Sequence, residues 1–178
     1  MTIVPDEKDW TWVLSRPCPE CGFDAASTDP SSVSGVVRGM LPRWRAVLER
    51  DDVAVRPEES TWSRLEYACH VRDVYGVFDE RLKLMLTQDD AIFADWDQDR
   101  AAIDGDYANQ DPAKITEELI SRGESIADAF AAVERSQWGR TGMRSNGSAF
   151  TMVTFAQYFL HDGVHHLHDV ESQSAATS

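Results

Sequence analysis

Histidines near the C-terminal end of the chain have the spacing of metal ligands. The chain of 178 residues contains five histidines, and four of them lie between residues 161 and 168. Residues four apart on a helix share one face, so His161 and His165 can present their imidazoles side by side. A divalent cation such as Zn²⁺ binds imidazole nitrogen at about 2.0–2.1 Å. A third imidazole has to come from elsewhere, and His70 is the only histidine outside this stretch.

The pattern around these histidines favours a site inside the protein. With about 100° per residue on a helix, His161, His165 and His168 fall on one stripe together with Tyr158, between apolar flanks. Buried polar groups need partners, and a cation supplies one to a neutral imidazole. Ordinary core or surface histidines are the competing interpretation. The pair on one stripe, with His70 on the apolar face of another helix, favours the metal.

Three imidazole ligands would leave at least one coordination position open. That is typical of a catalytic or substrate-binding metal and not of a closed structural site. Zn²⁺ and Ni²⁺ both suit imidazole, and the sequence does not choose between them. We expect His168, one turn beyond His165, and Tyr158 to line the pocket. His166 points about 100° away from His165, so we expect a surface group or a group behind the ligands.

The composition limits the classes of partner. The formal net charge is −14, so the phosphates of nucleic acids and anionic membranes would repel the chain. The sequence has no apolar run of about 18 residues for a membrane helix, and residues 1–9 have no apolar signal core. We therefore expect a cytoplasmic protein. Three cysteines are an odd number and do not indicate a disulfide framework.

Apolar residues at helical spacing predict an all-α protein. The four predicted helices cover residues 29–50, 60–87, 111–135 and 151–170. Pro42 is expected to kink or break the first of them. Residues 88–110 read as a long, partly helical connection and residues 138–147 as a loop, and no strand pattern competes. Four long helices with one long connection predict a four-helix bundle.

The domain organisation follows from these helices. Residues 1–28 form an irregular N-terminal extension whose apolar side chains are expected to pack across the outside of the domain. The bundle itself occupies residues 29–172. Residues 173–178 are small and polar, and we expect a disordered tail.

The extension carries a Cys-x-x-Cys turn whose role stays open. Cys18 and Cys21 supply half of the four ligands that a structural zinc site needs. A redox pair normally opens a helix in a thioredoxin-like unit, whereas here prolines flank Cys18. A structural turn, a position in or near a metal site, and a redox pair remain three alternatives.

The histidine pattern resembles the DinB-like superfamily. The residues that carry the likeness are Glu-Tyr-Ala-Cys-His-Val-Arg-Asp at 66–73, followed about 90 residues later by His161-x-x-x-His165. The likeness extends over about residues 29–172. It implies a four-helix bundle in which His70, His161 and His165 hold a divalent metal, with water or substrate completing the coordination shell.

The resemblance also implies an activity. Family members include S-transferases and isomerases that use mycothiol or bacillithiol, while others are known only as DNA-damage-inducible. Residues 9–12 and 17–24 are similar to an actinobacterial branch, which makes mycothiol the expected thiol. The implied reaction is attack of a metal-activated thiolate on an electrophile. Arg72, or else Arg64 or Arg140, would hold anionic parts of thiol or substrate, with ordinary surface ion pairs as the competing interpretation.

Two further functions are compatible with this metal site. One is a metal-dependent hydrolase, in which water replaces the thiol. The other is a non-catalytic metal-binding bundle that binds a ligand or forms a homodimer through its helices. An open metal position beside a cavity would favour an enzyme over the non-catalytic module.

Overall fold

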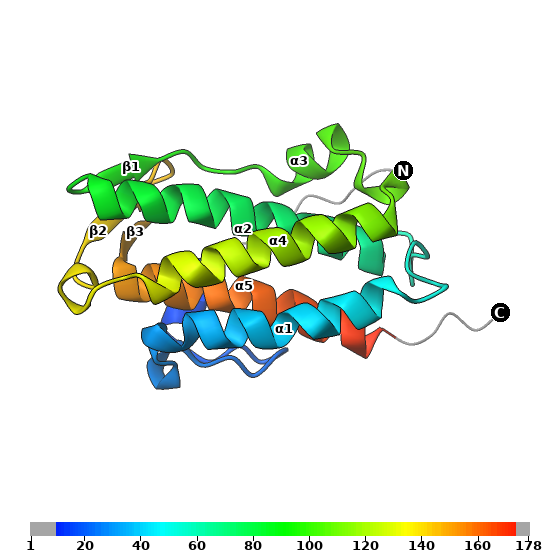
Figure 1. The fold of residues 1–178 in the computed structure, drawn as a ribbon, viewed down its shortest axis with the longest axis horizontal. Coiled ribbons are helices and arrows are strands. Elements are labelled where there is room, and N and C mark those ends of the chain that lie inside the picture. The colour runs from blue at the N-terminus through cyan, green and yellow to red at the C-terminus, as the bar shows by residue number, and fades with distance from the viewer. Residues whose placement is uncertain (1–9, 174–178) are drawn as a thin grey trace.

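Four long helices form the body of the protein within residues 10–173, the part of the chain that this computed structural model describes. These helices are α1 (Val33–Leu48), α2 (Arg64–Thr87), α4 (Pro112–Ala131) and α5 (Met152–Ser172). Figure 1 shows that α1 and α5 run in one direction and α2 and α4 in the other. Both α4 and α5 pack against α1 and α2. The predicted all-α bundle is confirmed.

The helix starts follow from local side-chain chemistry. Ser63 and Glu66 form a capping box at the start of α2, and Thr151 and Thr154 do the same for α5. Asp111 accepts from the backbone of Ala113, and Pro112 occupies the first turn of α4. Such caps satisfy backbone N–H groups that have no partner within the helix. α1 continues through Pro42 from Val33 to Leu48, so the predicted break does not occur there.

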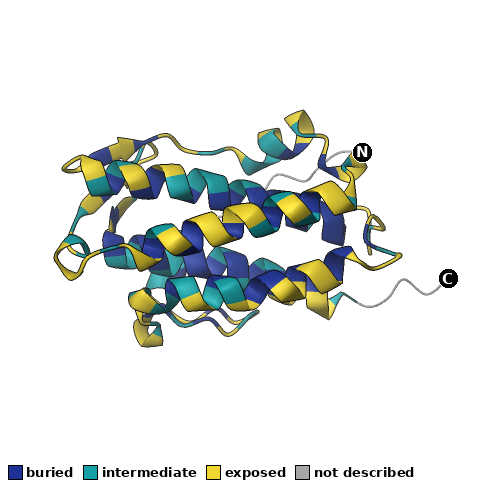
Figure 2. Ribbon diagram, in the orientation of Figure 1, coloured by how far each residue is buried: buried dark blue, intermediate teal, exposed yellow. Residues whose placement is uncertain are grey.

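The core lies between the four helices, where Figure 2 shows the buried faces turned inward. Aromatic rings fill much of it. Phe159 of α5 lies 5.1 Å from Phe78 of α2 and 5.3 Å from Phe130 of α4, measured between ring centroids. Trp44 of α1 is fully buried. Burying rings of this size is the main favourable contribution to folding, and it fixes α5 against its neighbours.

A small sheet, absent from the sequence prediction, closes one end of the bundle. In the described residues it comprises β1 (Ala91–Phe93), β2 (Thr141–Arg144) and β3 (Ala149–Thr151). β2 pairs in parallel with β1 and antiparallel with β3. The prediction that no strands compete was wrong because strands of three or four residues are too short to show a clear alternation. The sheet ties the α2–α4 connection to the α4–α5 connection.

Two further segments cover the bundle. The α2–α4 connection contains the short helix α3 (Gln98–Asp104) and returns along α2 (Figure 1). The N-terminal segment from Trp10 to Thr28 packs against α5, where the Gln157 side chain donates to the carbonyl oxygens of Ala25 at 2.8 Å and Thr28 at 3.1 Å.

The described part of the predicted N-terminal extension therefore packs on α5. Residues 1–9 and most of the predicted tail, 174–178, lie outside the described residues. Between residues 10 and 173, no helix has both the length and the apolar character that crossing a bilayer requires.

Candidate metal centres on α5

α5 carries two overlapping pairs of potential ligands. His161 and His165 are four residues apart, and so are Asp162 and His166. The two pairs are offset by one residue, which turns them about 100° apart on the helix. α5 can therefore present one pair to each of two neighbouring segments.

The three predicted ligands do not form one cluster in the described residues. His70 lies with Asp162 and His166, a group that we call the inner cluster. His161 and His165 lie with Cys18 and Cys21, a group that we call the cysteine cluster. Within each cluster, one ligand atom from every residue lies within 4.8 Å of all the others. The one-residue offset on α5 is the physical reason for this division.

The inner cluster joins α2 to α5. His70 Nε2 lies 3.6 Å from Asp162 Oδ1, and His166 Nε2 lies 3.9 Å from the same oxygen. The His70 and His166 rings are nearly perpendicular, with centroids 4.7 Å apart. The Asp162 carboxylate therefore lies close to two imidazoles. His70 belongs to α2, and His166 lies one turn beyond Asp162 on α5.

His70 is sealed from solvent without a hydrogen bond. It is 1% exposed, and neither ring nitrogen has a hydrogen-bond partner among the described residues. Asp162 Oδ1 is in the same condition within this part of the chain. Buried polar groups normally have partners, so two such groups facing each other at 3.6 Å suit a cation that would bind both.

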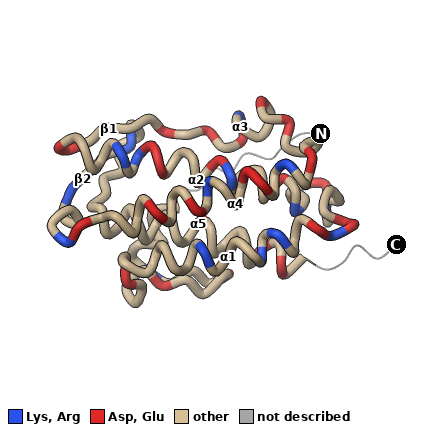
Figure 3. Tube along the Cα trace, viewed as in Figure 1, with Lys and Arg blue, Asp and Glu red and all other residues tan. Residues whose placement is uncertain are grey.

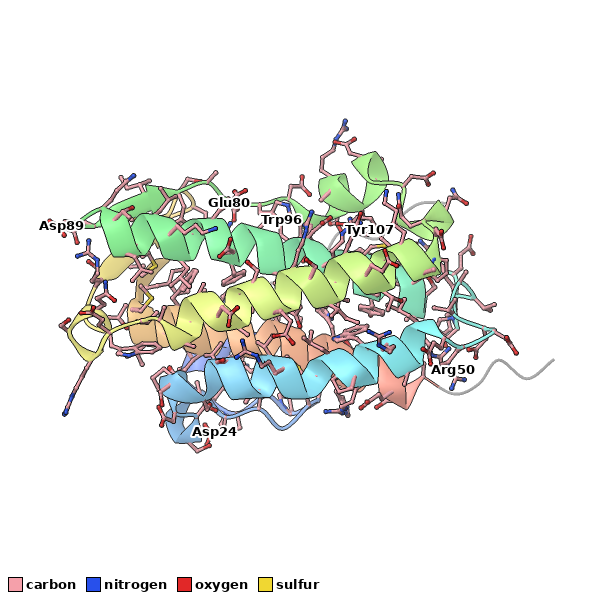
Figure 4. All side chains as sticks on the ribbon, viewed as in Figure 1. Asp24, Arg50, Glu80, Asp89, Trp96 and Tyr107 are labelled. Atoms are coloured by element: carbon pink, nitrogen blue, oxygen red, sulfur yellow. The ribbon has the colours of Figure 1, made fainter. Side chains whose placement is uncertain are left out.

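Aromatic rings enclose this imidazole. Trp96 stacks on His70 with ring centroids 5.4 Å apart, and Trp62 lies at 5.5 Å. Figure 4 shows Trp96 on the side of α2 where the connection to α3 returns. Tyr67, one turn before His70 on α2, packs on His166 at 5.2 Å. The rings fix both imidazoles and exclude water from one side of the cluster.

The protonation states suit a cation. Burial lowers the pKa of His70 despite the neighbouring Asp162 carboxylate. Burial by itself would raise the pKa of Asp162, but attraction to His70 and His166 outweighs it and holds that pKa at about 2. Neutral imidazoles and an ionised carboxylate at neutral pH are the forms that bind divalent metals.

A cavity of about 70 Å³ opens beside both clusters. Its walls include Trp10, Gln98, Tyr158, Asp162, His165 and His166. Tyr158 lies in the wall of this cavity, and its expected role in ligand binding stays a prediction. The cavity gives the inner cluster a side on which a small molecule can approach.

The cysteine cluster joins the N-terminal segment to α5. Cys18 Sγ lies 3.7 Å from His165 Nδ1, and both residues are buried, as is His161. Burial and its neighbour Cys18 raise the pKa of the Cys21 thiol to about 11. Burial, with His165 nearby, lowers the pKa of His161 to about 4.

The other predicted pocket residues lie elsewhere. Arg72 forms ion pairs with Asp73 at 2.8 Å and Glu118 at 2.9 Å, and it is not part of the cavity wall. His168 is exposed and borders a separate surface hollow of about 350 Å³ that Cys21 also lines.

The two alternative arginines are also engaged away from the cavity. Arg64 donates to the carbonyl oxygen of Gln173 at 2.7 Å, and Arg140 pairs with Asp89 at 3.0 Å. For these arginines the structure fits the competing interpretation of ion pairs and backbone contacts.

Two residues of the inner cluster were missed by sequence reasoning. Asp162 was not considered as a ligand, and His166 was expected at the surface or behind the ligands. The signal was present, because the two residues have the same four-residue spacing as His161 and His165. Carboxylates are so common on helix surfaces that this spacing alone is weak evidence.

Comparisons with known proteins agree on the fold. A family model described as the DinB superfamily matches residues 36–170. A search of curated proteins finds no match. Among solved structures, the chain is similar to YfiT from Bacillus subtilis, with a TM-score of 0.69 and 14% identity over 80% of this chain and 85% of that one. YfiT is described as a probable metal-dependent hydrolase with an unusual four-helix bundle topology. At this identity the likeness shows the fold alone.

Proposed function

The chain belongs to the DinB superfamily, and on that premise we propose that it is a metal-dependent enzyme whose catalytic cation binds His70, Asp162 and His166. The observation that carries this proposal is the buried His70 imidazole. Its two nitrogens lack hydrogen bonds within the described chain, and a carboxylate oxygen faces it at 3.6 Å.

The donor set fits a catalytic cation. Two imidazoles and one carboxylate hold Zn²⁺ in several hydrolytic enzymes and Fe²⁺ in oxygenases. Three protein ligands leave at least one position for water or substrate. Asp162 and His166 both border the 70 Å³ cavity. A water or substrate molecule in the open coordination position would therefore face this cavity.

The reaction that this arrangement supports best is hydrolysis. A divalent cation held there would supply Lewis acidity and lower the pKa of a bound water or thiol. Asp162 would balance the charge of the cation, and the rings around His70 would keep the ligands oriented. Tyr158 and Gln98 line the cavity, and in this proposal they would contact a substrate there. The description of YfiT as a probable metal-dependent hydrolase supports the same class.

Thiol S-transfer is the second candidate. The inner cluster has no thiol of its own in the described residues, since the nearby Cys69 directs its Sγ to the carbonyl oxygen of Tyr107 at 3.9 Å. The thiol would therefore be a cosubstrate such as mycothiol, activated in place of water. The aromatic residues Trp10 and Tyr158 line the cavity, and they favour this candidate because apolar parts of an electrophile could pack against them.

The test compares Asp162→Asn with a control on the same helix, His168→Ala. Zn²⁺, Ni²⁺ and Fe²⁺ are loaded separately, and each protein is assayed for metal content, for hydrolysis of an ester and amide panel, and for thiol consumption with a chlorinated aromatic. We expect Asp162→Asn to lose one cation per chain and about 100-fold of the activity. His168→Ala should retain both its metal content and its activity.

The outcomes separate the candidates. Hydrolysis that depends on Asp162 supports the first, and thiol consumption that depends on it supports the second. A chain that binds the cation but catalyses neither reaction would be a binding module. Full metal content and activity in Asp162→Asn would refute the assignment of the inner cluster.

A further inference from the structure

We propose that Cys18, Cys21, His161 and His165 form a second metal centre, a closed Zn²⁺ site that fastens the N-terminal segment to α5. This site is separate from the proposed catalytic cluster and does not depend on it. Its role is structural, because four protein ligands leave no position for a substrate.

The spacing of the donor atoms matches tetrahedral zinc. Zn–S bonds of about 2.3 Å and Zn–N bonds of about 2.0–2.1 Å at the tetrahedral angle place sulfur and nitrogen about 3.6 Å apart. Cys18 Sγ and His165 Nδ1 are 3.7 Å apart. All four ligand atoms lie within 4.8 Å of one another, so small side-chain rotations bring the set to bonding distance.

The chain folds locally so that both thiols face the same way. Gly22 N donates to the carbonyl oxygen of Cys18 at 2.9 Å, and Cys18 N donates to that of Phe23 at 2.8 Å. This tight turn needs a left-handed residue after the second cysteine, and Gly22 supplies it with φ +74°. The Cys-x-x-Cys-Gly sequence thus predisposes the turn to present two sulfur ligands.

The two imidazoles of this site come from α5. His165 directs Nδ1 to Cys18, while its Nε2 faces Glu20 at 3.4 Å and Asp169 at 3.6 Å. A carboxylate behind the outer nitrogen is the usual support of a metal-binding histidine. His161 is 4% exposed, and its Nε2 has no hydrogen-bond partner among residues 10–173. A buried polar atom without a partner points to a ligand here.

The surroundings argue against a redox pair. A reactive Cys-x-x-Cys owes its low thiol pKa to the N-terminus of a helix. The first helical element after Cys21 is only a three-residue 3-10 turn, Ala25–Ser27. Both cysteines are free, and Cys18 is buried beside His165. Two thiols and two imidazoles at these distances favour zinc over electron exchange.

The site also affects the proposed catalytic cavity. Trp10 packs on His161 at 5.7 Å and on His165 at 5.2 Å, and the same indole lines the cavity. A cation in the cysteine cluster would hold this segment, and therefore one cavity wall, against α5. Loss of the cation should free the segment while the bundle stays folded.

The test uses Co²⁺ as a spectroscopic substitute for Zn²⁺ in the full chain. We expect a near-ultraviolet sulfur-to-cobalt charge-transfer band and the strong visible bands of tetrahedral cobalt. The double variant Cys18→Ser, Cys21→Ser should lose these bands and one Zn²⁺ per chain. Cys69→Ala, which removes the thiol outside the cluster, should keep both.

A second measurement needs no variant. In the wild-type protein, Zn²⁺ should protect Cys18 and Cys21 from alkylation, as mapped by mass spectrometry, and a chelator should expose them and make residues 10–28 sensitive to proteolysis. Asp162→Asn should keep the cobalt bands, so the two metal proposals can fail separately. The proposal is overturned if wild-type protein shows no thiolate band, or if Zn²⁺ leaves both thiols open to alkylation.

Discussion

Glu66 is a buried acid one turn before His70 on α2. Its carboxylate accepts from the Ser63 backbone at 2.8 Å and from Arg56 Nε at 2.9 Å. Burial alone would raise the pKa of Glu66, but the hydrogen bonds from Arg56 and Ser63 outweigh it and hold the pKa below its ordinary value. The charged form of Glu66 therefore stabilises the start of the helix that carries His70.

This pKa predicts a pH-dependent stability. Because the folded-state pKa is depressed, the stabilisation is complete above the unfolded value of about 4.3 and is lost as pH falls through the folded value. We expect Glu66→Gln to lower the free energy of unfolding by about 1–3 kcal/mol at neutral pH, with a smaller difference in acid. Urea denaturation at several pH values measures this. Exposed Glu58→Gln is the control, and a difference that did not change with pH would contradict the prediction.

The ligands show how far residue spacing can be interpreted. Sequence reasoning found His161, His165 and His70 and placed all three on one cation. The structure instead gives His70 to the inner cluster and the other two to the cysteine cluster. Spacing shows which residues share a helix face, but it does not show which segment packs on that face. Cys18 and His165 are 147 residues apart in the sequence. Their contact therefore depends on how the N-terminal extension packs on α5, which spacing along a helix does not reveal.

At the scale of elements, α4 packs tightly against α1 and α2 at Gly123. A Cβ added at Gly123 would lie 2.4 Å from Leu41 Cδ2 and 3.0 Å from Tyr75 Cε2. Leu41 and Tyr75 are both buried, so neither can move away without disturbing the core. Gly35 on α1 has no such neighbour within 4 Å.

The two glycines predict opposite effects of the same substitution. Alanine is favoured over glycine in a helix by about 1 kcal/mol, so Gly35→Ala should leave stability unchanged or raise it. Gly123→Ala should lower the free energy of unfolding by about 1–3 kcal/mol, because the added methyl overfills the core. Thermal and urea unfolding of both variants measure the difference. Equal effects at the two positions would show that the helices do not pack closely at Gly123.

The elements were predictable where the pattern was long. Asp111–Pro112 and Thr151 gave the starts of α4 and α5, because caps and helical periodicity act locally. β1 was missed since only Ala91 and Phe93 are buried, around an exposed Ile92. An alternation over three residues is too short to predict a strand. β1 forms because β2, which lies far along the sequence and pairs with β3, also pairs with it.

At the scale of the whole molecule, acidic residues outnumber basic ones by 31 to 17. Figure 3 shows lysine and arginine scattered along the trace among acidic residues. Several arginines are also engaged in ion pairs, as Arg38 is with Glu124 and Arg43 with Glu171. Phosphate backbones bind proteins by exchanging counterions for clustered basic side chains, and these arginines already have carboxylate partners.

We therefore expect the protein not to bind duplex DNA. Non-specific DNA-binding proteins have dissociation constants of about 10⁻⁴–10⁻⁶ M at physiological salt, and binding tightens as salt falls. Fluorescence anisotropy of a labelled duplex should stay flat up to about 10⁻⁴ M protein, even at low salt, for both zinc-loaded and chelator-treated protein. A basic protein of similar size is the positive control. A saturable rise in anisotropy would contradict the prediction if the logarithm of the binding constant fell linearly with the logarithm of the salt concentration. It would reveal that paired arginines exchange their carboxylate partners for phosphate and so form a basic surface.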